Sequence, residues 1–287
     1  MKTIDTLIPD IQNALSNGIE VDGNVVNSFG DIMKNMMSSR LKTRDQKEFR
    51  IGMSNFGSPC VRKLWLSKYN PDKIEKMQSD AYLKFLYGDI IEEVILYLAE
   101  ATGHSVKGRQ DTLHLHGIEG HRDAIIDGVL VDVKSTSTFS FEKFKNGKLS
   151  EDDPFGYIVQ LQSYLEASQD DPDLIVKDKA AFLAVDKTLG HMHLDWHSKA
   201  DWNFKTLFEI RHAILNDEET LPEIPDNLAP VPEGKSGNMK LCTFCSYCNV
   251  KSLCYPELRT FVSSRGPLFL TTVEREPSMM EITETKT

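Results

Sequence analysis

Two aspartates and one lysine in the stretch GHRDAIIDGVLVDVKS have the residue types and spacing for hydrolytic chemistry. Asp123 closes one strand-like segment, and the next segment, GVLVDVK, carries Asp132 and Lys134. Residues two apart in a strand point to the same face, so we expect Asp132 and Lys134 to stand side by side, with Asp123 joining them across a hairpin. Two carboxylates and an amine on one sheet face predict a metal site with a cationic neighbour, which suits hydrolysis of a phosphodiester. The alternative is an edge strand whose alternating charges face solvent.

The predicted helices on either side of this stretch carry polar side chains that could complete such a site. In the segment GDIIEE, Glu92 follows Gly88 by four residues on the same helical face and could turn inward as a further metal ligand. Gln160 and Tyr164 are also four residues apart and could orient a water, a phosphate or the lysine. Each helix has an ordinary alternative: solvated glutamates in the first, and a tyrosine at the core boundary in the second.

Four of the five cysteines gather near the C-terminal end. They follow the pattern C-x2-C-x2-C-x5-C, while the fifth, Cys60, lies far upstream; the four are Cys242, Cys245, Cys248 and Cys254. A disulfide framework is not expected in a long chain that lacks a secretion signal. Thiolates at this spacing suit an iron–sulfur cluster or a tetrahedral zinc ion. Such sites normally take four ligands, so either Cys60 or Cys242 could be the fourth.

The bulk composition is that of an ordinary globular protein. Of its 287 residues, 40% are hydrophobic and 26% are charged. A net charge of -10 does not by itself favour nucleic-acid binding, because phosphate contacts need Lys and Arg. However, an acidic metal site contributes to that charge, and some basic residues are grouped, as at Lys143, Lys145 and Lys148. The chain has no long apolar run and no segment that looks like a signal peptide, so we expect a cytoplasmic protein without a membrane partner.

The predicted secondary structure alternates between helices and strands. We expect helices over residues 2–16, 24–40, 79–102, 155–168 and 199–216, and strands over residues 105–116, 121–127, 129–135, 179–186 and 191–196. A loop rich in Lys, Asp, Gly and Pro is expected over residues 142–154. This order predicts an α/β or α+β fold with a mixed central β-sheet flanked by helices.

Four regions are expected along the chain. They are a helical N-terminal region over residues 1–50, a catalytic core over 51–220, a linker and cysteine segment over 221–262 that packs back on Cys60, and a flexible tail over 263–287. The tail is expected to be flexible because the last residues mix Ser, Thr, Glu and Pro.

Together these features resemble the RecB-like branch of the PD-(D/E)XK nuclease superfamily, over about Ser58 to Cys254. GHRDAII resembles the motif with the first metal-binding Asp, VDVKS resembles the D/E-x-K motif, and QLQSY matches the Q-x-x-x-Y motif of this branch. Glu92 falls where the branch places a His or an acidic ligand. Cys60 with the C-terminal C-x2-C-x5-C resembles the split cluster site of AddB-type and CRISPR-adaptation nucleases and of phage-encoded exonucleases. Two departures are a surplus Cys242 and a Glu where His is common.

The resemblance implies a restriction-endonuclease-like core and a metal-dependent DNA nuclease. The expected activity is that of an exonuclease in DNA replication, recombination or phage DNA processing. The alternatives are a structure-specific endonuclease and a non-catalytic DNA-binding recombination module of the same fold. The expected partners are DNA, either single-stranded or as duplex ends, and recombination or replication proteins. A phage-encoded protein of this kind would act in the host cytoplasm.

The resemblance also assigns roles to individual residues. Glu92, Asp123 and Asp132, with the backbone carbonyl of Val133, would bind Mg2+ or Mn2+. Lys134 would position the attacking water and offset charge on the phosphate. Gln160 and Tyr164 would orient the lysine or the DNA strand. A [4Fe–4S] cluster, or Zn2+ as the alternative, would be held by Cys60, Cys245, Cys248 and Cys254, with Cys242 as a possible substitute.

Overall fold

The computed structural model describes residues 2–42, 49–76, 79–264 and 266–282. The chain divides into two units: unit 1 comprises Met1–Gly57 and Gln78–Lys205, and unit 2 comprises Ser58–Met77 and Thr206–Thr287. This division differs from the predicted core over residues 51–220. The segment that begins near Cys60 groups with the cysteine-rich region because Cys60 packs with Leu241 and Leu66 packs with Cys248.

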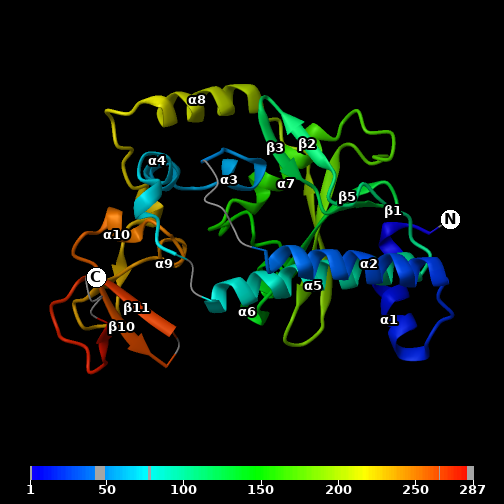
Figure 1. The fold of residues 1–287 in the computed structure, drawn as a ribbon, viewed down its shortest axis with the longest axis horizontal. Coiled ribbons are helices and arrows are strands. Elements are labelled where there is room, and N and C mark those ends of the chain that lie inside the picture. Colours follow the sequence, from blue (N-terminus) through cyan, green and yellow to red (C-terminus); the bar gives the residue numbers. More distant parts are fainter. Residues whose placement is uncertain (1, 43–48, 77–78, 265, 283–287) are drawn as a thin grey trace. The chain divides into compact units, whose positions relative to one another are not determined.

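A five-stranded mixed sheet forms the centre of unit 1, in the order β1-β4-β5-β6-β7 (Figure 1). Strands β5 and β6 are parallel, and the other neighbouring pairs are antiparallel. A separate hairpin pairs β2 with β3. The strands are β1 (Val106–Lys107), β2 (Thr112–Leu115), β3 (Ile118–His121), β4 (Ala124–Ile126), β5 (Val129–Thr136), β6 (Lys179–Asp186) and β7 (Met192–Ser198).

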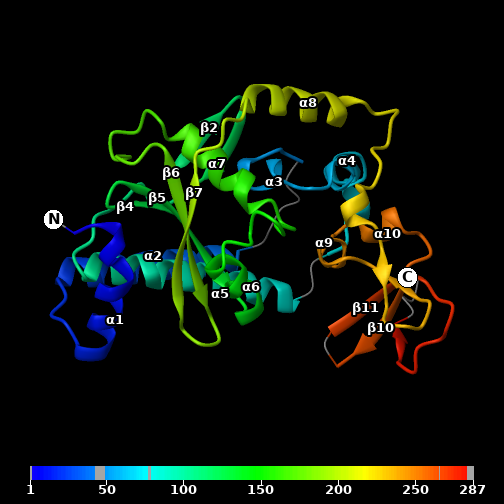
Figure 2. The same ribbon diagram turned by 180° about the vertical axis from the view of Figure 1, so that it is seen from behind.

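Helices pack on both faces of this sheet. On one face, α1 and α5 bury apolar side chains against β4, β5 and β6, and α2 lies along α5 (Figure 1). On the other face, α6 and α7 contact β5 and β6 (Figure 2). The helices of unit 1 are η1 (Ile4–Thr6), α1 (Leu7–Asn17), α2 (Gly23–Arg40), α3 (Met53–Phe56), α5 (Ser79–Ala101), α6 (Thr138–Lys145) and α7 (Tyr157–Ala167). The predicted class, a mixed central sheet flanked by helices, is confirmed.

Strand β5 alternates between an apolar face and a polar face. Val131 and Val133 belong to the core that also includes α1 and α5, whereas the intervening Asp132 and Lys134 face α7. The strand enters from β4 through a two-residue turn, Asp127-Gly128, in which both residues have positive φ, at 49° and 82°. That geometry matches the right-handed twist of the flanking strands and suits an Asp-Gly pair. The turn therefore sets the register that sends the aspartate and the lysine to one face.

One helix of unit 1 departs from the sequence prediction. Helix α6 occupies part of the stretch around residues 142–154 that was expected to be a loop. It begins where the Ser137 hydroxyl accepts a hydrogen bond from the backbone N–H of Ser140, and it buries Phe141 and Phe144 on one side. These two aromatic residues outweigh the Lys- and Gly-rich composition that suggested a loop.

Unit 2 contains an antiparallel sheet in the order β12-β10-β11-β9-β8. Its elements are α4 (Val61–Tyr69), η2 (Pro71–Lys73), η3 (Asp226–Leu228), β8 (Val231–Pro232), β9 (Met239–Lys240), α9 (Thr243–Ser246), α10 (Lys251–Cys254), β10 (Arg259–Ser263), β11 (Gly266–Thr272), β12 (Glu281–Ile282) and all but the first two residues of α8 (Phe204–Asn216). Residues 263–287 were expected to form a flexible tail. The structure instead places β11 and β12 there, because Phe261 and Leu270 bury apolar side chains between paired strands. Residues 283–287 lie outside the described part of the chain.

Candidate active site

The β4–β5 hairpin brings Asp123, Asp132 and Lys134 together in unit 1. Asp123 precedes β4, and its Oδ2 accepts a hydrogen bond of 2.7 Å from the backbone N–H of Val133 on β5. Asp132 is only 2% exposed, and the Nζ of Lys134 lies 2.6 Å from its Oδ2. The two side chains thus stand on the same face of β5, as their spacing predicts. Val133 contributes its backbone here while its side chain lies in the core.

The predicted Gln160–Tyr164 pair on α7 completes one side of the site. The Oε1 of Gln160 accepts a hydrogen bond of 3.4 Å from Lys134, and its Nε2 donates one of 2.8 Å to the Tyr164 hydroxyl. Burial raises the pKa of Tyr164 to about 12, so this hydroxyl stays protonated at neutral pH. Gln160 therefore links the lysine to a buried tyrosine, and its amide orientation is set by having one acceptor contact and one donor contact.

Burial, together with repulsion between neighbouring carboxylates, sets the electrostatics of the site. Burial raises the pKa of Asp123 well above its usual value, and the nearby charges of Asp132 and Glu92 raise it further. Burial also raises the pKa of Glu92 to about 7, with further contributions from Glu93, Asp132 and Asp89. Because the carboxyl groups of Asp123 and Glu92 resist ionisation beside Asp132, the site favours a bound cation.

Lys134 supplies part of that positive charge. Burial alone would lower the pKa of its amine, but the carboxylates of Asp132 and Asp123 raise it, so Lys134 is charged. The Lys134 Nζ forms an ion pair of 2.6 Å with the buried Asp132 Oδ2, which compensates part of the Asp132 charge.

The donor set suits a hard divalent cation, although it is not a finished coordination sphere. No group of three or more His, Cys, Asp or Glu side chains in the described residues is arranged to hold a metal ion as it stands. The carboxyl oxygens of Glu92, Asp123 and Asp132 are nevertheless the ligand type that Mg2+ and Mn2+ prefer. The buried Asp132 Oδ2, which is ion-paired with Lys134, is a ligand of this type, and a bound cation would relieve the repulsion.

Three further residues, which do not belong to the sequence motifs, also shape the site. The Tyr157 ring lies under the Lys134 ammonium, with Nζ 4.6 Å from its centroid, and the Phe182 ring lies at 5.8 Å. Gln110 donates a hydrogen bond of 2.6 Å to Glu92. Tyr157 precedes Gln160 by three residues, so helical periodicity could have placed it on the same face. Phe182 and Gln110 depend on strand and loop pairings that leave no local signal.

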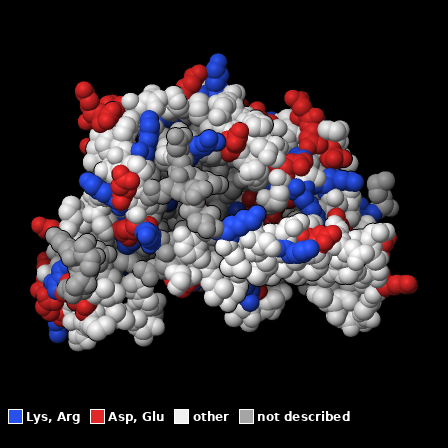
Figure 3. All heavy atoms as spheres, viewed as in Figure 1, with Lys and Arg blue, Asp and Glu red and all other residues white. Residues whose placement is uncertain are grey.

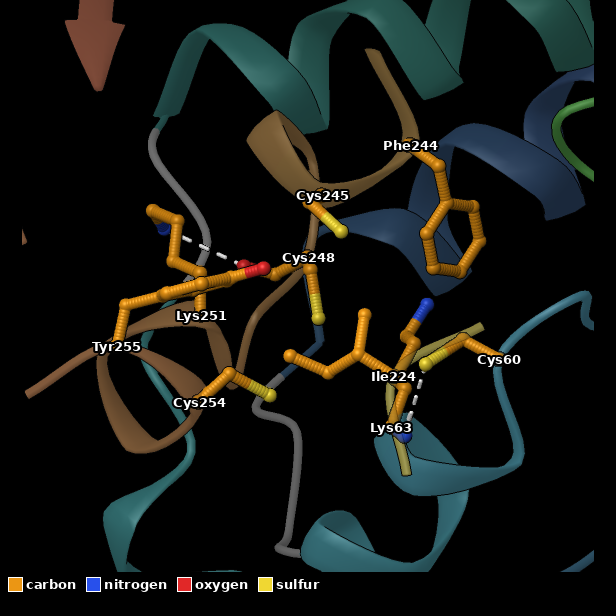
Figure 4. A pocket seen from close by; sticks show the side chains of 9 residues that line it. All are labelled: Cys60, Lys63, Ile224, Phe244, Cys245, Cys248, Lys251, Cys254 and Tyr255. Atoms are coloured by element: carbon orange, nitrogen blue, oxygen red, sulfur yellow. Dashed lines mark hydrogen bonds between the residues drawn. The ribbon is translucent and has the colours of Figure 1, made fainter. Parts of the chain in front are cut away.

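The cysteines form a second cluster, which lies wholly within unit 2. One pocket is lined by Cys60, Cys245, Cys248 and Cys254, and Figure 4 shows their sulfur atoms around it. Cys242 does not line this pocket but contacts the Cys245 side chain. All five thiols are free.

Electrostatics at this pocket follow from the crowding of the thiols. Burial raises the pKa of Cys248 to about 11, although Lys63 opposes this effect, and Cys254 and Cys60 raise it further. Burial likewise raises the pKa of Cys60. The N–H of Lys63 donates a hydrogen bond to the Cys60 sulfur. Thiols that resist ionisation together are ionised readily only when a metal binds them.

The charged surface on one face of the molecule is mixed. In Figure 3, Lys and Arg side chains of the described residues are interspersed with Asp and Glu. Near α6, Lys143 pairs with Asp152 and Lys145 pairs with Glu142. Within the described ranges, none of the helices combines the length and apolar character that crossing a bilayer requires.

Comparisons with known proteins give general similarity only. No protein-family model matches the chain, and no curated protein matches its sequence. Among solved structures, an alkaline exonuclease from Laribacter hongkongensis has a TM-score of 0.41 and 15% identity, covering 63% of this chain and 92% of that chain. The protein SSO0001 has a TM-score of 0.41 and 14% identity, covering 78% of this chain and 95% of that chain.

Proposed function

We propose that this protein is a metal-dependent nuclease that hydrolyses phosphodiester bonds in DNA, and that it acts as an exonuclease. The observation that carries the proposal is the packing of Asp123 and Asp132 against the charged Lys134, beside the carboxyl group of Glu92. Buried carboxylates that repel one another are costly to the fold. Such destabilising groups are typical of functional sites, and here they would serve to bind a divalent cation and a phosphate.

The chain's own groups have separable roles in this proposal. Glu92, Asp123 and Asp132, with the Val133 carbonyl, would hold Mg2+ or Mn2+, which polarises the phosphate and lowers the pKa of a bound water. Asp123 is already oriented by the backbone N–H of Val133.

Lys134 acts on the phosphate, and two side chains of α7 orient Lys134. The Lys134 ammonium places a positive charge beside the buried carboxylates, where it offsets negative charge that develops on the phosphate. Gln160 accepts from that ammonium, and Tyr164 fixes the other end of the Gln160 amide. This chain of contacts limits where the lysine can point.

The decisive assay is digestion of end-labelled linear DNA, single- and double-stranded, and of closed circular DNA, with Mg2+, Mn2+ or EDTA. An exonuclease degrades only the linear forms and is inactive in EDTA. Asp132→Ala and Lys134→Ala should each abolish cleavage, with Lys145→Ala, an exposed lysine on α6, as the matched control. Cleavage of closed circles would instead support the endonuclease, and metal-dependent activity retained in both site variants would refute the assignment.

We also propose that unit 2 binds a [4Fe–4S] cluster through Cys60, Cys245, Cys248 and Cys254. The support is that these four thiols line one pocket, while Cys242 stands beside it. In such a cluster each thiolate binds a different iron, so the four sulfurs need not close around a single ion. The cluster would hold segments on either side of a long stretch of chain together, which constrains the unfolded state.

The cofactor is tested on protein purified without oxygen. Iron and sulfide analysis and the visible spectrum should show a brown protein, and Cys60→Ala and Cys248→Ala should lose the colour while Cys242→Ala keeps it. A colourless wild type with one equivalent of zinc would replace the cluster by Zn2+. Colour lost in Cys242→Ala but kept in Cys60→Ala would reverse the choice of the fourth ligand.

A further inference from the structure

We propose that Tyr157 is a positioning residue that, with Phe182, forms an aromatic cradle for the Lys134 ammonium. The inference rests on the proposed nuclease function and adds to it a residue outside the D-x-K and Q-x-x-x-Y patterns. Lysine carries its charge on a flexible four-carbon stem, so a precise role for its ammonium requires neighbours that restrict it. The rings of Tyr157 and Phe182, which lie beside the Lys134 ammonium, supply that restriction.

The cradle is defined by distances around one nitrogen atom. Lys134 Nζ lies 4.6 Å from the centroid of Tyr157 and 5.8 Å from that of Phe182, both within the range of a cation–π interaction. The two rings are 6.4 Å apart with an interplanar angle of 58°, so they form adjacent walls rather than a parallel stack. The ammonium also contacts the Asp132 carboxylate and the Gln160 amide oxygen.

Both walls are held firmly by their surroundings. Phe182 is fully buried on β6, directly opposite Asp132 in the parallel pairing, and packs edge-on against Phe144 and His197. Tyr157 is the first residue of α7, where its backbone N–H donates to Asp153 Oδ1 at 3.0 Å. The side chain of Asp153 also accepts from the backbone N–H groups of Gly156 and Ile158, which anchors this end of the helix.

The rings and the carboxylate differ in how they respond to a bound cation. The attraction between Lys134 and Asp132 weakens when Asp132 shares its charge with a divalent ion. The attraction of an aromatic face for the ammonium comes from the ring quadrupole and does not depend on the charge of Asp132. Tyr157 therefore keeps Lys134 at the site under the conditions in which the reaction takes place.

The variants Tyr157→Leu and Tyr157→Phe separate the ring from the hydroxyl group. A desolvated cation–π interaction of about 2 kcal/mol corresponds to roughly a 30-fold change in rate. We expect Tyr157→Leu to lower kcat by about 10- to 30-fold with little change in KM for DNA, and Tyr157→Phe to restore nearly full kcat. Tyr87→Leu, which removes a half-exposed tyrosine on α5 of the same unit, is the matched control.

A second measurement reports on Lys134 without catalysis. Reductive methylation in EDTA, followed by peptide mass spectrometry, measures how accessible each lysine is, with the exposed Lys145 as the internal reference. Lys134 should be methylated faster in Tyr157→Leu than in wild type, and at the wild-type rate in Tyr157→Phe.

The outcomes are distinct. An unchanged kcat in folded Tyr157→Leu, or an equal loss in Tyr157→Phe, would overturn the cradle. If wild type fails to cleave DNA with either metal, the nuclease proposal fails, whereas the methylation rates still decide whether Tyr157 restrains Lys134.

Discussion

Glu92 should make the metal-free protein less stable as the pH rises, and Glu92→Gln should remove that effect. In the unfolded chain this carboxyl group ionises near 4.5, and in the folded protein near 7, because burial and the neighbouring acids disfavour its charge. Between these two values the folded state binds more protons than the unfolded state. Stability therefore falls as the pH rises through this range and levels off above about 7.

The magnitude follows from the size of that difference. A rise from 4.5 to about 7, at about 1.4 kcal/mol per pH unit, costs the folded state about 3.5 kcal/mol once Glu92 is ionised. For a protein of this size, about 3.5 kcal/mol corresponds to roughly 7–14 °C in Tm. Glutamine keeps the shape of the side chain and can still accept the hydrogen bond from Gln110.

The assay is thermal unfolding in EDTA at pH 5 and pH 8.5. The Tm of wild type should fall by most of the amount given above between pH 5 and pH 8.5. Glu92→Gln should have the higher Tm at pH 8.5 and nearly the same Tm as wild type at pH 5. Glu142→Gln, on the exposed side of α6, should leave the pH dependence unchanged. Mg2+ should raise the Tm of wild type at pH 8.5 more than that of Glu92→Gln. An identical fall in Tm for wild type and Glu92→Gln would refute the reasoning.

Three further substitutions test other parts of unit 1. Gln160→Leu should lower kcat for DNA digestion by about tenfold, since it removes a hydrogen bond of about 1–1.5 kcal/mol to the lysine, and an unchanged kcat would contradict this role. Gly156→Ala should lower the free energy of unfolding in urea by more than about 3 kcal/mol, because φ is +76° and a Cβ would lie 2.1 Å from a facing backbone oxygen. The control Gly147→Ala, where φ is +65° but the space around the Cβ is open, should lower it by only about 1 kcal/mol. His104→Ala should cost about 2–4 kcal/mol in the same measurement, because both ring nitrogens of this buried side chain contact aspartates, whereas the exposed His114→Ala should be nearly neutral.

The polar face of β5 could be predicted because it depends on local periodicity. A strand fixes the relation between residues two apart, which gives the pairing of Asp132 with Lys134. A helix fixes the relation between residues four apart, which gives the contact between Gln160 and Tyr164. The fold class followed from the order of such segments. Each of these inferences needs only a few neighbouring residues.

The rest of the site depends on pairings between distant segments. Phe182 reaches Lys134 because β6 pairs in parallel with β5 and places Phe182 opposite Asp132, a register that no local pattern specifies. The association of Cys60 with the C-terminal cysteines has the same non-local character, and the sequence left the choice between Cys60 and Cys242 open. The strand β11 was missed for a different reason: polar and proline-rich neighbours concealed the short apolar run that buries Leu270.

The two faces of β5 explain how the fold tolerates a destabilising site. Val131 and Val133 are almost completely buried against α1 and α5, so the strand is held by apolar packing that does not involve the site. Between them, Asp132 is placed where its charge is repelled by two other carboxyl groups and is met by a single amine. The backbone cannot move to relieve this repulsion without exposing the valines. The carboxylates therefore remain close together when no cation is present. A bound cation relieves their repulsion, and this relief adds to the free energy of cation binding.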